Sequence, residues 1–384
     1  MRKVYFDHSA TTSVDPQVVE AMLPFFHEKF GNPSSIHSFG RETKVALEEA
    51  REAVAEVLKV RAADIYFTSG GTESDNLAIK GVAYELKNKG KHIITSKVEH
   101  HAVLHTCESL EKEGFEITYL SPDKYGMIHP ETVEKAIKSN TILISIMHAN
   151  NEVGTINPIE KIGEIAQGKG IIFHTDAVQT FGKLPLNLAK LPIDLMSISA
   201  HKIYGPKGIG ALYIRKGVKL TQLMHGGGHE RNRRAGTENI PGIIGLAKAV
   251  ELRKQNFKEE NEHVKKLRDR FAERINKEVP RAILNGHPEK RLAGHLNLSF
   301  QGIEGEALLL SLDLKGIAAS SGSACTSGSI DPSHVLLAMG VKPELARSSI
   351  RFSLGKDNTE ADVDYTLEIL PEIVTRLRSM SAIE

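Results

Sequence analysis

The sequence predicts an α/β protein with a large domain built on a mostly parallel sheet and a smaller α/β domain at the C-terminal end. The chain has 384 residues, which is more than one hydrophobic core usually serves. Its 40% hydrophobic and 25% charged residues are typical of globular proteins. Short apolar runs alternate with amphipathic stretches through the first two-thirds, which indicates βα units with helices on both faces of the sheet.

The expected elements of the large domain begin with a helix at Asp15 and Pro16. An aspartate there can accept from unpaired N–H groups, and a proline suits the first helical turn. Polar groups at the carboxyl ends of the strands are expected to form the functional site. Helices are expected at residues 16–30, 42–58, 71–87, 101–113, 131–139 and 159–167. Seven strands are expected at residues 64–68, 92–95, 116–120, 141–147, 171–174, 195–199 and 211–214.

The sequence pattern changes near residue 241. Residues 241–279 predict one or two long charged helices, with a polar break around residues 256–261. Further on, strands are expected at 296–300 and 349–354 and helices at 304–314 and 333–339. We therefore expect a large domain at residues 13–250 and a small domain made of residues 1–12 and 251–384.

Composition excludes several classes of protein. The net charge of +1 gives no overall field that would attract nucleic acid or an anionic membrane. No apolar run approaches the roughly 18 residues that a membrane-spanning helix needs. The N-terminal residues include no apolar secretory segment, and two cysteines are too few for a disulfide framework. These observations predict a cytoplasmic protein that binds neither nucleic acid nor a membrane.

Lys202 and Asp176 each follow an apolar run that reads as a strand. Lys202 closes the segment Ser199-Ala-His-Lys, and a turn rich in glycine and proline comes next. An amine and a carboxylate at the ends of two strands suit pyridoxal phosphate. The amine forms a Schiff base with the aldehyde, and the carboxylate keeps the pyridine nitrogen protonated.

A phosphate site is predicted where Ser69-Gly-Gly-Thr-Glu73 joins a strand to a helix. Glycines let backbone N–H groups approach an anion, the helix start adds favourable partial charge, and Thr72 offers a hydroxyl. By itself the segment is better explained as an ordinary tight turn with a helix cap. Beside Lys202 and Asp176, a phosphate site is the better interpretation, and Ser199 and His201 could reach the same group.

His100 follows the strand expected at residues 92–95 and so belongs to the same edge of the sheet. It could stack on a pyridine ring and transfer protons, or it could be a histidine that merely starts a helix. Both interpretations remain open. His225-Gly-Gly-Gly-His229 is a poor metal site, because its glycines would leave the ligand pair mobile and no further ligand stands at helical spacing.

The two cysteines differ in their surroundings. Cys107 lies in a helical pattern and is expected to be an inert packed thiol. Cys325 lies among small residues at about 318–332, a segment that predicts an exposed loop. An exposed thiol is prone to oxidation, which favours a reactive role over that of a small filler residue.

Arg351 lies in Ser348-Ser-Ile-Arg-Phe-Ser-Leu354, which alternates as a strand does. A guanidinium can bind a carboxylate through two parallel hydrogen bonds, as an amino-acid substrate would require. An ordinary solvated arginine on an edge strand explains the local sequence equally well.

Taken together, the motifs resemble those of cysteine desulfurases of the NifS/IscS type, which are fold-type I pyridoxal phosphate enzymes of the class V aminotransferase family. The resemblance runs along essentially the whole chain. It rests on Asn32-Pro-Ser-Ser35, Thr68-Ser-Gly-Gly-Thr-Glu-Ser-Asp-Asn76, Glu99-His-His-Ala102, Asn150-Asn-Glu-Val-Gly154, His174-Thr-Asp-Ala-Val-Gln179, Ser199-Ala-His-Lys202, Arg234-Ala-Gly-Thr-Glu-Asn239, Ser321-Gly-Ser-Ala-Cys325 and Arg351-Phe-Ser-Leu354.

The resemblance implies a role for each matching residue. Cys325 would be the nucleophile that accepts sulfur from L-cysteine, Lys202 would form the Schiff base, and His100 would stack on the cofactor ring. The substrate carboxylate would be held by Asn32 and Arg351. The remaining cofactor contacts would come from Gly71, Thr72, Asn151, Asp176, Gln179, Ser199, His201 and Thr237.

The resemblance also implies partners. Thr237 would reach the phosphate of a second subunit, so a homodimer is expected, and an iron–sulfur scaffold protein is the expected sulfur acceptor. No intrinsic metal site is expected, although Cys325 could be a transient iron–sulfur ligand through its persulfide. His8 and His229 depart from the family pattern outside the expected catalytic positions. A selenocysteine lyase and a related aminotransferase remain alternative functions.

Overall fold

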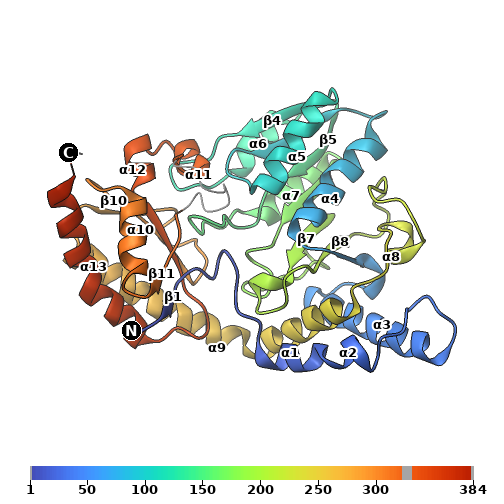
Figure 1. Ribbon diagram of the computed structural model, residues 1–384. Coiled ribbons are helices and arrows are strands. Elements are labelled where there is room, and N and C mark those ends of the chain that lie inside the picture. The colour runs from blue at the N-terminus through green and yellow to red at the C-terminus, as the bar shows by residue number, and fades with distance from the viewer. Residues whose placement is uncertain (1, 322–330, 382–384) are drawn as a thin grey trace.

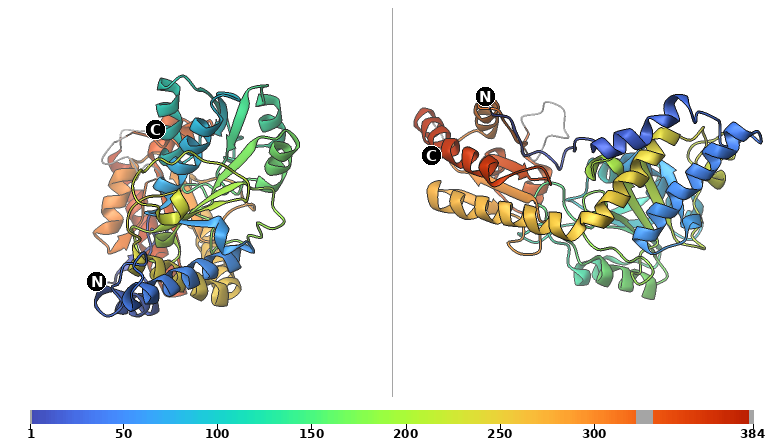
Figure 2. Two further views of the ribbon diagram at one scale, coloured as in Figure 1. Left: turned by 90° about the vertical axis from the view of Figure 1, so that its right-hand side faces the viewer. Right: turned by 90° about the horizontal axis from the view of Figure 1, so that it is seen from below.

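The computed structural model describes residues 2–321 and 331–381. In Figure 1 the central sheet and its helices form one part of the molecule and the C-terminal elements form the other. The helix α9 (Ile240–Glu278) runs along both parts, which the view from below in Figure 2 shows most clearly. The domain boundaries given above stay a prediction.

The central sheet has seven strands in the order β2-β8-β7-β6-β5-β3-β4. All neighbours are parallel except β8, which runs antiparallel to β2 and β7. The predicted mostly parallel, seven-stranded sheet is therefore confirmed. Its strands are β2 (Ile65–Thr68), β3 (His92–Ser96), β4 (Glu116–Leu120), β5 (Thr141–Ser145), β6 (Ile172–Asp176), β7 (Leu195–Ser199) and β8 (Gly210–Ile214).

Helices pack on both faces of this sheet and bury apolar clusters against it. The apolar runs of the strands are long enough to be buried on both faces, as parallel sheets require. The helices and 3₁₀ turns of this part are α1 (Pro16–Met22), α2 (Pro24–His27), α3 (Ser38–Leu58), η1 (Ala62–Asp64), α4 (Gly71–Leu86), α5 (His101–Lys112), α6 (Pro130–Ala136), α7 (Ile159–Gly168), η2 (Ala200–Lys202) and α8 (His229–Asn232).

Two helix predictions near the N-terminus are wrong in their bounds. Residues 16–30 form the two short helices α1 and α2 rather than one, because Pro24 has no N–H to continue the first helix. Asp15 caps α1 as predicted, accepting from the N–H of Gln17 at 3.0 Å. The next helix, α3, begins at Ser38 rather than residue 42, because His37 caps it by accepting from the N–H of Gly40.

The predicted polar break in α9 is also wrong, because the helix continues unbroken through residues 256–261. Asn256 donates back to the carbonyl of Leu252 one turn earlier, and Asn261 donates to the carbonyl of Lys183 at 2.9 Å. Since both amide groups bond without displacing backbone hydrogen bonds, the polar residues do not end the helix.

The C-terminal part is built on the antiparallel sheet β9-β10-β12, and the two-stranded sheet β1-β11 lies beside it. Phe6 follows β1 and packs against Phe271 of α9 and Phe352 of β12, with ring centroids 5.5 and 6.3 Å away. The elements are β1 (Val4–Tyr5), β9 (Ala282–Asn285), β10 (His295–Phe300), α10 (Gly305–Asp313), β11 (Ile317–Ala318), α11 (His334–Ala338), α12 (Pro343–Arg347), β12 (Ser349–Ser353) and α13 (Glu360–Met380).

Within residues 2–321 and 331–381, no helix combines the length and the apolar character that crossing a lipid bilayer would require. Cys107 is fully buried on α5, and burial raises the pKa of its thiol far above the usual range. The prediction that Cys107 is a packed thiol is therefore confirmed, and its lack of reactivity stays a prediction.

Candidate active site

A cavity of about 310 Å³ opens at the carboxyl ends of β2, β6 and β7. This is the edge where the sequence placed the functional groups, and ligands of open α/β sheets bind there. The predicted residues that line it are Gly71, Thr72, His100, Asn151, Asp176, Gln179, Ser199, His201, Lys202 and Arg351. Ser9, Ala10, Asp75, Met147 and Val178 complete its wall.

Lys202 lies at the end of η2, the short 3₁₀ turn that directly follows β7. Its Nζ donates to the carbonyl oxygens of Ser9 at 2.5 Å and Ala10 at 2.6 Å. The N-terminal segment is held there because Thr12 donates its hydroxyl to the carbonyl of His201 at 3.0 Å. The amine is thus positioned by backbone carbonyls of the N-terminal segment, and no sequence signal marks Ser9 or Ala10 as its partners.

Asp176 ends β6 and is almost fully buried. Burial raises the pKa of its carboxyl to about 6, although the N–H of Val178 at 2.8 Å and the charge of Lys202 both favour the ionised form. Asp75 of α4 is buried beside it. Burial and then the charge of Asp176 raise the pKa of Asp75 well above its usual range. We conclude that Asp75 holds a proton and Asp176 carries the negative charge of the pair.

The turn before α4 provides the predicted anion site. Gly70 has φ +152°, a conformation that side chains other than glycine rarely adopt. A Cβ on Gly71 would stand 2.7 Å from Cγ2 of Val178, so the second glycine is required by close packing. With the N-terminus of α4 and the hydroxyl of Ser199 close by, the turn can present N–H and O–H donors to a phosphate.

His100 both starts α5 and lines the cavity, and its predicted stacking and proton transfer stay predictions. It caps α5, because its Nδ1 accepts from the N–H of Ala102 at 3.1 Å, and it also lines the cavity. Burial and then the charge of Lys202 lower its pKa to about 4. The ring is therefore neutral at pH 7, with Nδ1 an acceptor and Nε2 left to carry the proton.

Arg351 of β12 is 2% exposed, which rules out the alternative of a solvated arginine. Its guanidinium donates to the carbonyl of Asn151 at 3.1 Å and to the carboxylate of Asp7 at 2.8 Å. Its Nε is buried and has no hydrogen-bond partner among the described residues. A buried guanidinium that lines the cavity and has an unsatisfied donor suits the carboxylate of a substrate.

Gln179 is positioned by two polar contacts. Its Nε2 donates to the carbonyl of Ser9 at 3.0 Å, and its Oε1 accepts from Nζ of Lys183 at 3.4 Å. This fixes the amide between the N-terminal segment and the segment after β6. It is therefore held rigidly at the cavity wall, as a cofactor contact should be.

Two of the predicted residues, Asn32 and Thr237, do not line the cavity. Asn32 is exposed, and its Oδ1 accepts from the N–H of Ser34 at 2.9 Å. Thr237 is exposed in the segment that follows α8. Cys325 lies outside the described residues, as does most of the loop predicted at 318–332. Their roles stay predictions.

The two residues that depart from the family pattern lie away from the cavity wall. His8 is buried with its ring edge-on to Tyr5, and burial lowers its pKa to about 4. His229 pairs through Nδ1 with the carboxylate of Glu238 at 2.9 Å. Among the residues that the structure describes, no group of three or more histidine, cysteine or acidic side chains is arranged to hold a metal ion.

The residues of this cavity fit pyridoxal phosphate. The group needs an amine for its aldehyde, a carboxylate for its ring nitrogen and anion donors for its phosphate. Lys202, the ionised Asp176 and the glycine turn before α4 provide these three, and the neutral ring of His100 offers a stacking surface. Cavities of this size also hold small-molecule cofactors in other proteins.

Comparison with known proteins agrees with the geometry. Residues 4–366 match the family of class-V aminotransferases. The chain is 59% identical over 380 residues to the cysteine desulfurase IscS of Methanosarcina thermophila, covering 99% of this chain and 94% of that protein. It is 57% identical over 380 residues to the cysteine desulfurase IscS of Dictyoglomus turgidum, covering 99% and 96%.

A solved structure described as a NifS-like protein has 44% identity and a TM-score of 0.92, covering 98% of this chain and 100% of that one. These findings confirm the predicted resemblance and the fold-type I architecture. The chain belongs to the class-V aminotransferase family.

Proposed function

We propose that the protein is a pyridoxal phosphate-dependent cysteine desulfurase. It converts L-cysteine to L-alanine and delivers the sulfur, as a persulfide on Cys325, to an acceptor for iron–sulfur cluster assembly. The observation that carries this proposal is the cavity in which Lys202, Asp176 and Arg351 face one small volume. It is supported by the IscS relatives and by a structure described as SspA in complex with cysteine, which has 40% identity and a TM-score of 0.83 and covers 93% of this chain and 100% of that one.

Each residue has a distinct task in this reaction. Pyridoxal phosphate, when bound, supplies an aldehyde that condenses with amines and a ring that accepts electrons. Asp176 keeps the ring nitrogen protonated, and Arg351 orients the carboxylate of cysteine. Nζ of Lys202 removes the proton from Cα of the bound substrate, and neutral His100 can donate from Nε2 beside the ring.

The sulfur step balances without an outside oxidant or reductant. The thiolate of Cys325 attacks the sulfur of the substrate, a sulfur–sulfur bond forms, and the carbon–sulfur bond of cysteine breaks. The three-carbon product takes up a proton and leaves as L-alanine. The persulfide on Cys325 is then available to a second protein, for which an iron–sulfur scaffold protein is the proposed acceptor.

An assay of three reactions separates this function from its alternatives. The purified holoenzyme is expected to form equal amounts of alanine and thiol-releasable sulfur from L-cysteine. Turnover at least about tenfold faster on L-selenocysteine would favour a selenocysteine lyase, and turnover that requires a 2-oxo acid would favour an aminotransferase.

Radiolabelled sulfur should pass from Cys325 to a scaffold protein added in equal amount; failure of this transfer alone would contradict only the proposed acceptor.

Replacing Asp176 by asparagine is expected to weaken cofactor binding about a hundredfold or more, because the bound pyridinium loses its buried counter-charge. The matched control is Asp75→Asn. An amide has nearly the shape of the protonated carboxyl, so a change below about threefold is expected. Titration of each apoprotein with pyridoxal phosphate measures both affinities. Equal losses in the two variants would contradict the assignment of charge to Asp176.

The same assignment predicts how cofactor binding depends on pH. The raised pKa of Asp176, about 6, means that the folded protein binds this proton at higher pH than an ordinary aspartate does. The carboxylate needed by the pyridinium is therefore present above about pH 6 and is lost as the pH falls below it. Affinity in the unmodified protein should fall in that range, and affinity in the Asp176→Asn variant should not.

We also propose that the protein is a homodimer, in which Thr237 reaches the phosphate of the partner. An apolar surface on α1, α2 and the start of α3 supports this. Its residues are Val19, Leu23, Phe26, Phe30, Ile36, Phe39 and Val45, each at least 43% exposed. Exposed apolar surfaces of this extent mark interfaces. Arg231 of α8 contacts Glu48 of α3, so α8, which precedes Thr237 in the chain, lies beside α3 (Figure 1).

The double substitution Phe30→Asp with Phe39→Asp tests the dimer, because these two exposed rings contact each other on that surface, with centroids 5.6 Å apart. Sedimentation should show a dimer for the unmodified protein and a monomer for the variant. The matched control is Leu310→Asp with Leu314→Asp, two exposed leucines at α10 that should leave the dimer intact. An unmodified protein that sediments as a monomer would contradict the proposal.

A further inference from the structure

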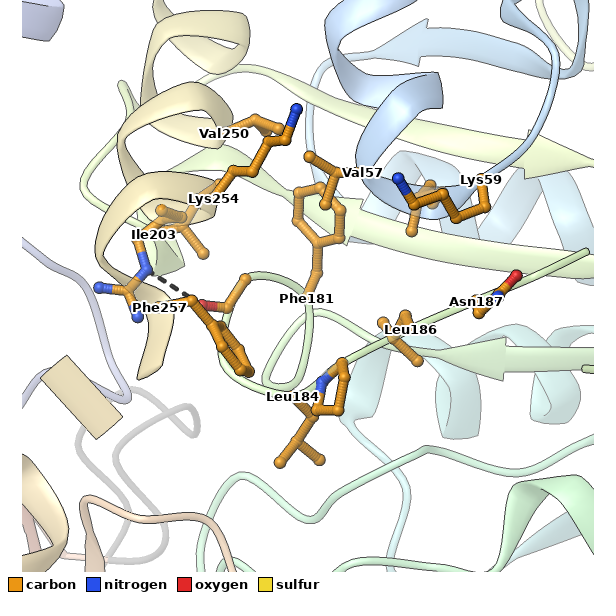
Figure 3. Close-up of a pocket in the computed structure, with 14 residues that line it drawn as sticks. Val57, Lys59, Phe181, Leu184, Leu186, Asn187, Ile203, Val250, Lys254 and Phe257 are labelled. Carbon is orange, nitrogen blue, oxygen red and sulfur yellow. Dashed lines mark hydrogen bonds between the residues drawn. The ribbon is translucent and has the colours of Figure 1, made fainter. Parts of the chain in front are cut away.

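A second cavity of about 360 Å³ lies between the end of α3, the middle of α9 and the segment that follows β6. Figure 3 shows Val57 and Lys59 entering from α3, and Val250 and Lys254 from α9. Among the described residues, the two cavities share no lining side chain. The cavity is therefore distinct from the site proposed for cysteine and its cofactor.

Most of the wall of this second cavity is apolar. Phe181, Ile203 and Val250 are buried in its floor and sides. Leu184 and Phe257 are half-buried at its edge, and Figure 3 shows them across from Phe181. A hollow of this volume lined by aliphatic and aromatic side chains lies within the range of small-molecule sites, and it would take the apolar body of a ligand.

The charged side chains of the lining are all cationic. Lys59, Arg253 and Lys254 contribute to the wall, and none of the described residues that line it carries a carboxylate. Arg253 is already held inside, because its Nε donates to the carbonyl of Gly182 at 3.0 Å and it pairs with Glu260.

The two lysines at the opening have less fixed partners. Lys254 pairs with Glu56 at 2.6 Å, but both side chains are exposed, and an exposed ion pair contributes little to stability. Lys59 is exposed and has no ion pair among the described residues. The same Glu56 carboxylate also lies within reach of the charge of Lys59. An anionic group at the opening would therefore meet two lysines and compete with one exposed carboxylate.

We propose that this cavity binds a small amphipathic monocarboxylate, with the apolar body inside and the carboxylate between Lys59 and Lys254. This goes beyond the desulfurase activity and does not depend on it. The site adjoins the active site along the chain, because Gly182 precedes Lys183, the partner of Gln179, and Ile203 follows Lys202.

The test is calorimetric titration of the holoenzyme with three ligands of equal chain length. Decanoate should bind saturably at one site per subunit, 1-decanol should bind more weakly, and decyltrimethylammonium should bind least. Absence of saturable decanoate binding would overturn the proposal. Equal affinity for the acid and the alcohol would overturn the role of the lysines.

Variants of the chain locate the site. Val250→Phe should fill the cavity and abolish binding. If this variant fails to fold, Leu184→Trp should fill the cavity from its edge and also abolish binding. The pair Lys59→Gln with Lys254→Gln should weaken decanoate binding about five- to tenfold and leave decanol binding unchanged. Lys258→Gln, an exposed lysine of α9 outside the lining, is the matched control. Decanoate binding that survives both filling substitutions would place it elsewhere and overturn the assignment.

Discussion

Replacing Lys202 by alanine is expected to reduce turnover on L-cysteine by on the order of 10³-fold or more, because one amine serves both as the covalent attachment point and as the base for the Cα proton. In the structure Ser9 and Ala10 hold the Nζ of this lysine at the wall of the cavity. The variant should also lose the cofactor absorbance that depends on covalent attachment.

The matched control for this substitution is Lys207→Ala, an exposed lysine five residues further along the same turn. Alanine formation and cofactor absorbance should both stay unchanged there. Borohydride treatment of the unmodified protein, followed by peptide mass measurement, should place the reduced cofactor on Lys202. A label on another lysine would contradict the assignment, even if the alanine variant were inactive.

Replacing Cys325 by serine is expected to lower sulfur release from cysteine by at least about 10³-fold while the cofactor remains bound. A serine hydroxyl is neither ionised near neutral pH nor able to carry a persulfide, so the acceptor of the sulfur is lost. The absorbance of the attached cofactor therefore distinguishes the two variants. Lys202→Ala should lose it, and Cys325→Ser should retain it.

Cys107→Ala is the matched control for the cysteine prediction. This thiol is buried among apolar side chains, so its removal should lower the free energy of unfolding by about 1 kcal/mol and leave turnover unchanged. Mass measurement after brief exposure to cysteine should find added sulfur on Cys325 only. Normal turnover in the Cys325→Ser variant would contradict the nucleophile assignment.

The strands could be predicted because each is an apolar run between polar turns, a local pattern that burial in a parallel sheet requires. The helix ends were less predictable. Pro24 divides the first helix, and His37 starts α3 before its apolar pattern begins. The asparagines in the middle of α9 resemble a break in sequence, yet their side chains bond without disturbing the backbone.

The active site shows the same division between local and distant effects. Lys202, Asp176 and the glycine turn were predictable because each stands at a strand end, where an α/β fold collects its functional groups. The carbonyls of Ser9 and Ala10 and the protonated Asp75 were not, because nothing in a local sequence shows which distant backbone will meet a side chain. Arg351 illustrates the limit, since only packing distinguishes a buried arginine at the cavity from a solvated arginine on an edge strand.

The sequence by itself determined the α/β class, the order of the strands along the chain and the residue types that pyridoxal phosphate chemistry needs. These follow from side-chain periodicity and from turn chemistry, which act over a few residues. Only the tertiary structure decided that burial raises the pKa of Asp75 and lowers the pKa of His100, and that a second, largely apolar cavity with cationic side chains lies between α3 and α9. Protonation states and cavities depend on desolvation and on charges brought together from distant parts of the chain, and folding alone sets these.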